Sequence, residues 1–138
     1  KGVSGTAIHA DGYNTLITLP HEKAPAIENE ITLEGWIALS AYPWNDIPIG
    51  KTGKGDGYFL GVSGHGYPVF KVNSGGIRAT VTLPELQGSD PQKVIDRGLY
   101  KDNLELFTWY HLAGSYNSSD GILHIYLNGK EVASSKPA

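Results

Sequence analysis

The sequence predicts an all-β domain in which two antiparallel sheets pack face to face as a sandwich. Three observations support this prediction. Short segments alternate between apolar and polar residues, and turn-forming residues separate them at intervals of about eight to twelve positions. The chain contains 18 glycines in 138 residues, and no segment has a convincing helical pattern. Because each sheet then has one apolar face, the two sheets must bury these faces against each other.

The C-terminal hairpin is the clearest element. Residues 123–127 alternate Leu or Ile with His or Tyr, so the aliphatic side chains share one face of a strand. Asn128 and Gly129 follow at once, and both residue types tolerate the positive φ that a type I′ turn requires at its two central positions. Residues 130–134 return as the partner strand, and residues 109–116 form a strand upstream. Three consecutive antiparallel strands are predicted here.

The rest of the chain contains further segments with the composition of strands. They are residues 4–10, 14–19, 31–40, 47–51, 58–63, 67–73 and 77–83. Both faces of 31–40 carry apolar groups, so we expect an interior strand that is covered on both sides. Residues 21–30 are polar and predict a loop with at most one helical turn. Residues 84–103 form the longest polar stretch and predict a loop, with one or two helical turns at 91–97.

Length and composition limit the function classes. A chain of 138 residues fits one domain, 1–138. A net charge of −3 gives no sign of the basic patch that nucleic acid requires, and no run of 18 apolar residues predicts a membrane span. The absence of cysteine excludes disulfides, metal–thiolate sites and thiol nucleophiles. Methionine is absent even at position 1, so we expect the chain to be part of a larger or processed protein.

Four segments resemble motifs of the laminin-G-like family of jelly-roll domains, which belongs to the concanavalin A-like lectin and glucanase fold. The segments are 7–13, 31–37 with a T-x-E-x-W pattern, 109–116 with a W-x-H-[VL]-A pattern, and the hairpin 123–132. The resemblance spans nearly the whole chain and implies a jelly-roll sandwich. It also implies a final strand beside the first one. No such segment follows the hairpin in this sequence, so we expect either that another piece of chain supplies the strand or that the sheet edge stays open.

The resemblance also implies a setting. Modules of this family are commonly attached to secreted carbohydrate-active enzymes, proteases or adhesion proteins, and the loop 41–45 most resembles modules of fructan-cleaving glycoside hydrolases. We therefore expect a secreted, extracellular or periplasmic location. The expected function is that of a carbohydrate-binding or enzyme-accessory module whose partner is a carbohydrate or an adjacent catalytic domain. The alternatives are a protein–protein adhesion module and a structural spacer.

Catalysis by this chain is not expected. Glucanases of this fold place two or three carboxylates on one strand face, and glycoside cleavage needs such a pair about 5–10 Å apart. Glu34 stands alone on its predicted strand, and Glu105 has no acidic residue two positions further on. Glu34 and Trp36 share one strand face. We expect Glu34 to accept hydrogen bonds from a neighbouring loop and Trp36 to pack.

Sugar binding requires exposed aromatic planes together with amides and carboxylates for the hydroxyl groups. One loop supplies both kinds of group, and three more residues could add to the same surface. The candidate ligand-binding residues are Tyr42, Trp44, Asn45, Asp46, His65, Tyr67 and Arg78. The alternative is that Trp44 closes one end of the sandwich or docks on a neighbouring domain.

Calcium is the one cofactor that the resemblance implies, with a site near the first turn. Asp11 and Asn14 offer side-chain oxygens there, and backbone carbonyls could add more. Asp11 fits an ordinary turn position equally well.

Overall fold

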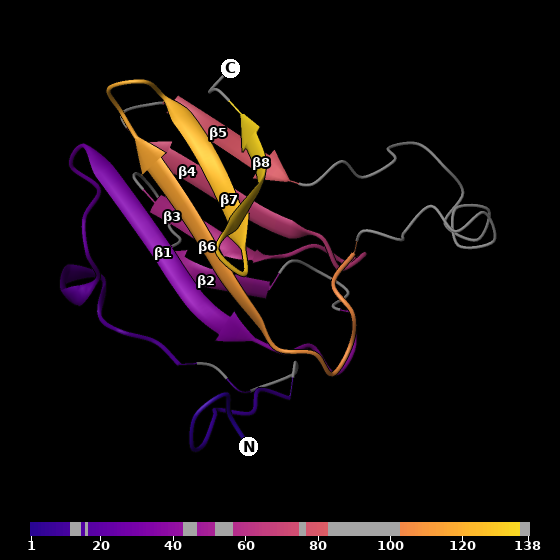
Figure 1. Ribbon diagram of the computed structural model, residues 1–138. Helices are drawn as coiled ribbons and strands as arrows, with labels where there is room; N and C mark the ends of the chain where they lie inside the picture. Colours follow the sequence, from indigo (N-terminus) through magenta and orange to yellow (C-terminus); the bar gives the residue numbers. More distant parts are fainter. Residues whose placement is uncertain are drawn as a thin grey trace.

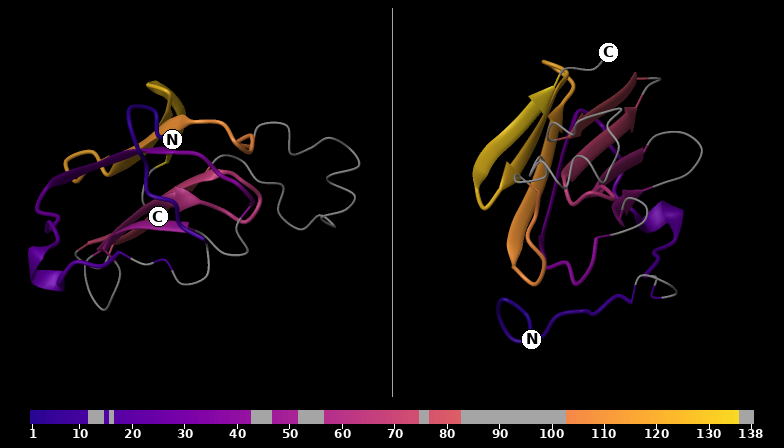
Figure 2. Two further views of the ribbon diagram at one scale, coloured as in Figure 1. Left: turned by 90° about the horizontal axis from the view of Figure 1, so that it is seen from below. Right: turned by 90° about the vertical axis from the view of Figure 1, so that its right-hand side faces the viewer.

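The computed structural model describes residues 1–11, 15, 17–42, 47–51, 57–74, 77–82 and 103–135. Within these residues it contains eight strands and one short 3-10 helix, η1 (His21–Lys23). The strands form two antiparallel four-stranded sheets that lie one behind the other (Figures 1 and 2). The predicted all-β sandwich is confirmed.

The front sheet, which faces the viewer in Figure 1, has the strand order β1-β6-β7-β8. Its strands are β1 (Glu30–Ile37), β6 (Tyr110–Asn117), β7 (Ile122–Leu127) and β8 (Lys130–Ser135). Asn128 and Gly129, between β7 and β8, have φ values of 52° and 81°. Both are positive, as a type I′ turn requires, so the three predicted C-terminal strands and their connecting hairpin are confirmed.

The back sheet is a simple meander in the order β2-β3-β4-β5. Its strands are β2 (Ile47–Lys51), β3 (Gly57–Val62), β4 (Pro68–Ser74) and β5 (Ile77–Thr82). Each boundary lies within one residue of the sequence prediction. The turn between β3 and β4 closes through the Gly66 N–H, which donates to the Ser63 carbonyl at 2.9 Å, and Gly66 has a φ of 84°.

Aliphatic side chains and one aromatic ring fill the space between the sheets. Leu60 and Phe70 of the back sheet and Leu112, Leu123 and Ile125 of the front sheet are almost completely buried. Phe70 packs directly against the backbone of Gly114 in β6. A Cβ atom at position 114 would lie 2.7 Å from two ring carbons of Phe70, so glycine lets the β6 backbone rest directly on this ring.

Two predictions about the N-terminal half are wrong. Residues 4–10 and the described part of 14–19 contain no strand. Ile8, Ile17 and Leu19 are 75%, 68% and 70% exposed. The local pattern suits a strand, but a strand also needs a neighbouring backbone to satisfy its hydrogen-bonding groups, and no strand of the described part pairs with this segment.

The strand predicted at 31–40 exists as β1, but among the described strands it is an edge strand and not an interior one. β1 lies at the edge of the front sheet, and its residues alternate between exposed and half-buried. The apolar character of Trp36 suggested cover on both sides, whereas the structure covers one face only. Residues 84–102, with the helical turns expected at 91–97, lie outside the described residues. No helix of the described part is long and apolar enough to cross a membrane.

Candidate functional site

The structure brings two of the predicted ligand-binding residues together at one end of the sandwich. The Tyr42 hydroxyl donates to the Leu104 carbonyl at 2.9 Å, and its ring lies against Gly66 in the turn between β3 and β4. In the same turn, the His65 carbonyl accepts a hydrogen bond from Asn103 Nδ2 at 3.0 Å. Tyr42 remains 39% exposed. Tyr42 and His65 therefore share one surface, and ligand contact by either stays a prediction.

Of the other predicted residues, only Tyr67 and the backbone of Arg78 are described, and neither adds to that surface. Tyr67 is only 3% exposed, so its ring offers no open plane to a ligand. The Arg78 backbone pairs with Asn73, five positions along β4 from Pro68 and therefore roughly 17 Å from the turn that holds His65. The last three candidates, Trp44, Asn45 and Asp46, lie outside the described residues.

The residues predicted for calcium are only partly described. Asp11 is exposed, and its Oδ1 accepts a hydrogen bond from the Thr15 N–H at 3.1 Å. The Asp11 N–H in turn donates to Thr15 Oγ1 at 3.4 Å. Asn14 lies outside the described residues, and the described residues contain no cluster of three or more His, Asp or Glu side chains suited to a metal ion. This geometry is that of a turn residue, and a calcium site at Asp11 and Asn14 stays a prediction.

The outward side of the front sheet carries a second group of polar and aromatic residues, which we call the front face. In β1, alternate residues are exposed while Ile31, Leu33 and Ile37 pack against the core. The register places one β6 residue opposite each exposed β1 residue, and continues across β7 and β8. The front face consists of Thr32, Glu34, Trp36, His111, Ala113, Ser115, His124, Tyr126 and Glu131.

Trp36 is the largest exposed side chain of the front face. It is 52% exposed, and its ring meets the His111 ring edge-on, with centroids 5.3 Å apart and planes at 65°. Trp36 therefore packs in part, against His111, and leaves about half of its surface open. The register explains the contact, since Trp36 and His111 are directly opposite each other on β1 and β6.

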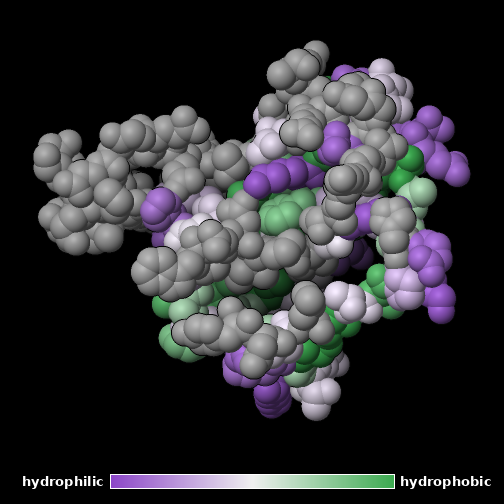
Figure 3. All heavy atoms as spheres, turned by 180° about the vertical axis from the view of Figure 1, so that it is seen from behind, coloured by the Kyte–Doolittle hydropathy of each residue, from purple (hydrophilic) through white to green (hydrophobic). Residues whose placement is uncertain are grey.

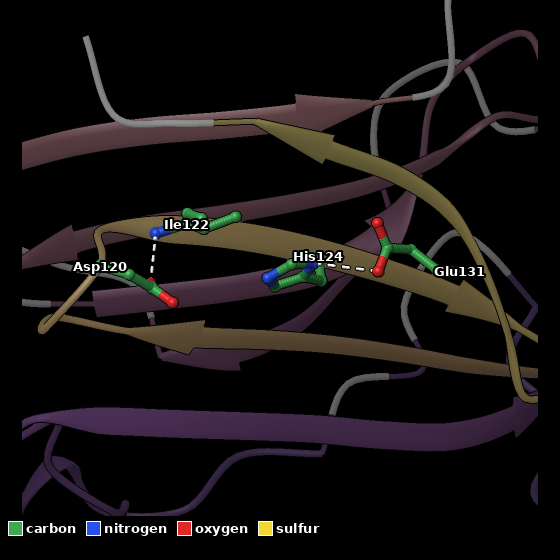
Figure 4. A network of polar contacts seen from close by, with 4 residues as sticks. All are labelled: Asp120, Ile122, His124 and Glu131. Atoms are coloured by element: carbon green, nitrogen blue, oxygen red, sulfur yellow. Dashed lines mark hydrogen bonds and ion pairs between the residues drawn. The ribbon is translucent and has the colours of Figure 1, made fainter.

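Two carboxylate–histidine pairs accompany the indole. Glu34 Oε2 lies 3.6 Å from His111 Nε2, with the Glu34 side chain 67% exposed. Within the described residues this partner of Glu34 comes from the adjacent strand β6, whereas the sequence predicts one from a loop. On the other side of the face, His124 Nδ1 lies 3.2 Å from Glu131 Oε2 (Figure 4). Both pairs offer hydrogen-bond donors and acceptors at the surface.

Small residues separate these groups. Ala113 and Ser115 of β6 lie between the larger side chains of β1 and β7. Strand spacing puts the Cα atoms of Trp36 and Tyr126 roughly 12 Å apart, two strands across and two residues along. The front face therefore has an aromatic residue on each side of β6, with hydrogen-bonding groups between and beside them.

The outer face of the back sheet is arranged differently. There the Lys71 ammonium lies 4.9 Å from the centroid of the Phe59 ring. From this side, described hydrophobic residues are visible near the middle of the molecule, with hydrophilic ones around them (Figure 3). Because a cation occupies one side of the Phe59 ring, we regard the front face as the better candidate site.

Sequence reasoning identified Glu34 and Trp36 as neighbours on one strand face but missed the site that they belong to. The signal was present in the alternation of β1. The contributions of His111, His124 and Tyr126 depend on the pairing of β1 with β6 and of β6 with β7, which no local pattern specifies.

Comparison with known proteins agrees with the fold. A family model, Laminin_G_3, described as the concanavalin A-like lectin/glucanases superfamily, matches residues 11–138. Among solved structures, a Bacteroides ovatus protein named "putative carbohydrate binding protein" superposes with a TM-score of 0.53 at 20% identity, over 83% of this chain and 28% of that one. The native heptameric SAP-like pentraxin of Limulus polyphemus gives 0.48 at 16% identity, over 82% and 46%. No curated protein matches the chain.

Proposed function

The chain belongs to the concanavalin A-like lectin/glucanase superfamily, and on this premise we propose that it is a carbohydrate-binding module whose ligand lies on the front face. The observation that carries the proposal is the exposed indole of Trp36 beside the Glu34–His111 pair. The apolar face of a sugar ring packs well on an indole, while carboxylates and imidazoles exchange hydrogen bonds with sugar hydroxyls.

The charge of the front face favours a neutral glycan. The strands β1, β6 and β7 contain no lysine or arginine, and Lys130 of β8 is opposite Leu127, which packs toward the core. Glu34 and Glu131, by contrast, both project from the face. A uronic acid or sulfated polysaccharide would bring anions close to these carboxylates without a cation from those strands to balance them, which costs binding energy. We therefore expect neutral polysaccharides to bind more tightly than acidic ones.

The placement of the same carboxylates supports binding without hydrolysis. A glycosidase holds two carboxyl groups about 5–10 Å apart across one sugar linkage. Glu34 and Glu131 stand on the two outer strands of the front sheet, and each carboxylate is paired with a different histidine, His111 or His124. We propose that the chain binds a glycan and leaves it intact.

The wider setting is also part of the proposal. We infer that the module is secreted and serves a larger protein, a glycoside hydrolase, by holding its substrate or by packing against its catalytic domain. The chain spans 28% of the Bacteroides ovatus protein, which is named for carbohydrate binding. A module within a longer carbohydrate-active protein fits that proportion.

Affinity electrophoresis and titration calorimetry with neutral polysaccharides (inulin, levan, xylan, mixed-linkage glucan) and acidic ones (pectate, dextran sulfate) test this function. We expect a neutral polysaccharide to bind, and Trp36→Ala to weaken its binding at least tenfold, about 1.4 kcal/mol. Leu19→Ala is the matched control, because Leu19 is an exposed apolar residue outside the front face. Unchanged binding by Trp36→Ala would refute the site, and failure of the unmodified chain to bind any of these glycans would refute the function.

A further inference from the structure

Phe107 combines two properties that the fold does not require. Its side chain is 78% exposed, and its φ is 57°, in the left-handed region. Glycine, asparagine and aspartate enter that region readily, whereas a bulky residue there is an outlier with strained backbone. Asn128 is the other non-glycine residue with positive φ in the described part, and asparagine suits its turn. At position 107 the sequence has a large aromatic residue where a small polar one would be less strained.

The contacts of this segment use the backbone of Phe107. Its N–H donates to the Leu39 carbonyl at 2.7 Å, a bond that any residue except proline could make. Leu104, three residues earlier, provides the buried side chain of the segment, being only 1% exposed. The Phe107 ring belongs to neither the core nor the side chains packed around it. The ring is therefore retained at a cost that packing does not offset.

Phe107 lies at the Trp36 end of the front sheet. The segment that leads into β6 runs next to the chain just beyond the C-terminal end of β1 (Figure 1), where Phe107 bonds to Leu39. Leu39 is three residues beyond Trp36 in the chain, so the Cα atoms of Leu39 and Trp36 are at most roughly 10 Å apart. Two strongly exposed aromatic side chains, Trp36 and Phe107, thus stand at the same end of the molecule.

We propose that Phe107 is the apolar contact of a second subsite, which takes the sugar ring beyond the one that packs on Trp36. This inference rests on the proposed function and adds to it that the ligand is an oligosaccharide or polysaccharide of neutral sugars long enough to reach both rings. Strained residues persist where function selects them against stability, and an exposed aromatic plane is the chemistry that a sugar ring needs.

Replacement of Phe107 separates stability from binding. Phe107→Asn removes the ring and places a residue that tolerates positive φ, so we expect a melting temperature unchanged or raised by roughly 2–4 °C. We expect the same variant to bind a hexasaccharide at least tenfold more weakly while its affinity for the disaccharide stays unchanged. Phe107→Trp, which keeps an aromatic plane, should retain hexasaccharide binding. The probes are the disaccharides and hexasaccharides of the inulin, xylan and mixed-linkage glucan series.

The outcomes distinguish this inference from the proposed function. Hexasaccharide binding that is lost in Trp36→Ala but unchanged in Phe107→Asn would overturn the second subsite and leave the function standing. A clear fall in the melting temperature of Phe107→Asn would assign the ring a structural role and also overturn the inference. Failure of the unmodified chain to bind both these oligosaccharides and the polysaccharides used to test the function would overturn both proposals.

Discussion

Gly114→Ala is the substitution that most directly tests how closely the two sheets approach. The added Cβ would lie 2.7 Å from Cδ2 and Cγ of Phe70 and 3.1 Å from Cδ1. Real Cβ atoms do not approach other atoms below 3.0 Å, and Phe70 is fully buried, so either the ring or the β6 strand must shift. Overpacking of this kind costs about 1–3 kcal/mol.

Thermal unfolding measures this cost. For a chain of 138 residues, 1 kcal/mol corresponds to roughly 3 °C, so Gly114→Ala should lower the melting temperature by about 3–10 °C. Gly35→Ala is the matched control in the same sheet, because a Cβ at Gly35 meets no atom within 4 Å. We expect that variant to melt at the same temperature or slightly higher, since alanine restricts the unfolded chain more than glycine does.

A double-mutant cycle tests whether Phe70 is the side chain that the added Cβ at position 114 presses against. Phe70→Leu makes room beside position 114 at the cost of a small cavity, so Gly114→Ala should cost at least about 1 kcal/mol less in the Phe70→Leu background than alone. If Gly114→Ala and Gly35→Ala melt at the same temperature, or if the two costs simply add, the close contact between β6 and Phe70 does not govern the packing of the sheets.

Three further predictions follow from single contacts. Asn128→Ala should lower stability by about 1–2 kcal/mol in denaturant unfolding, because alanine disfavours positive φ and cannot accept the 2.9 Å hydrogen bond that the His111 N–H donates to Asn128 Oδ1. Asn128→Gly should lose less stability, because glycine tolerates positive φ, and an equal loss in the two variants would contradict the φ argument. Tyr42→Phe should cost about 1 kcal/mol in the same assay through loss of the hydroxyl bond to the Leu104 carbonyl, and an unchanged stability would show that water replaces that bond fully. If the predicted calcium site exists, added calcium should raise the melting temperature of the unmodified chain and not of Asp11→Ala, whereas equal shifts, or none, would exclude Asp11 as a ligand.

Local patterns predicted most of the strands, because alternation and turn chemistry act over a few residues. Asn128-Gly129 specifies the hairpin through φ preferences alone, and the strands of the back sheet match their predictions within one residue. The same reasoning failed at residues 4–10, since a strand forms only where another backbone pairs with it, and sequence pattern does not reveal which segments have such a neighbour.

The candidate site was harder to predict than the fold. Loop chemistry drew attention to Tyr42 and His65, which the structure does bring to one surface, but it grouped them with Tyr67, which is buried. Tyrosine occurs both in cores and on surfaces, so the residue type alone does not predict whether a given tyrosine is buried or exposed. The left-handed backbone of Phe107 gave no signal either, because a bulky residue such as phenylalanine does not suggest positive φ.

The sequence by itself determined the antiparallel sandwich, the hairpin turns and the placement of Glu34 and Trp36 on the same face of β1. Each of these depends only on the period of a strand or on the conformational range of one or two residues. Only the tertiary structure decided that this face is open, and that the histidines at 111 and 124 and the tyrosine at 126 share it. Exposure and register arise from contacts between segments far apart in the chain, and these are set by how the two sheets pack together rather than by any local preference.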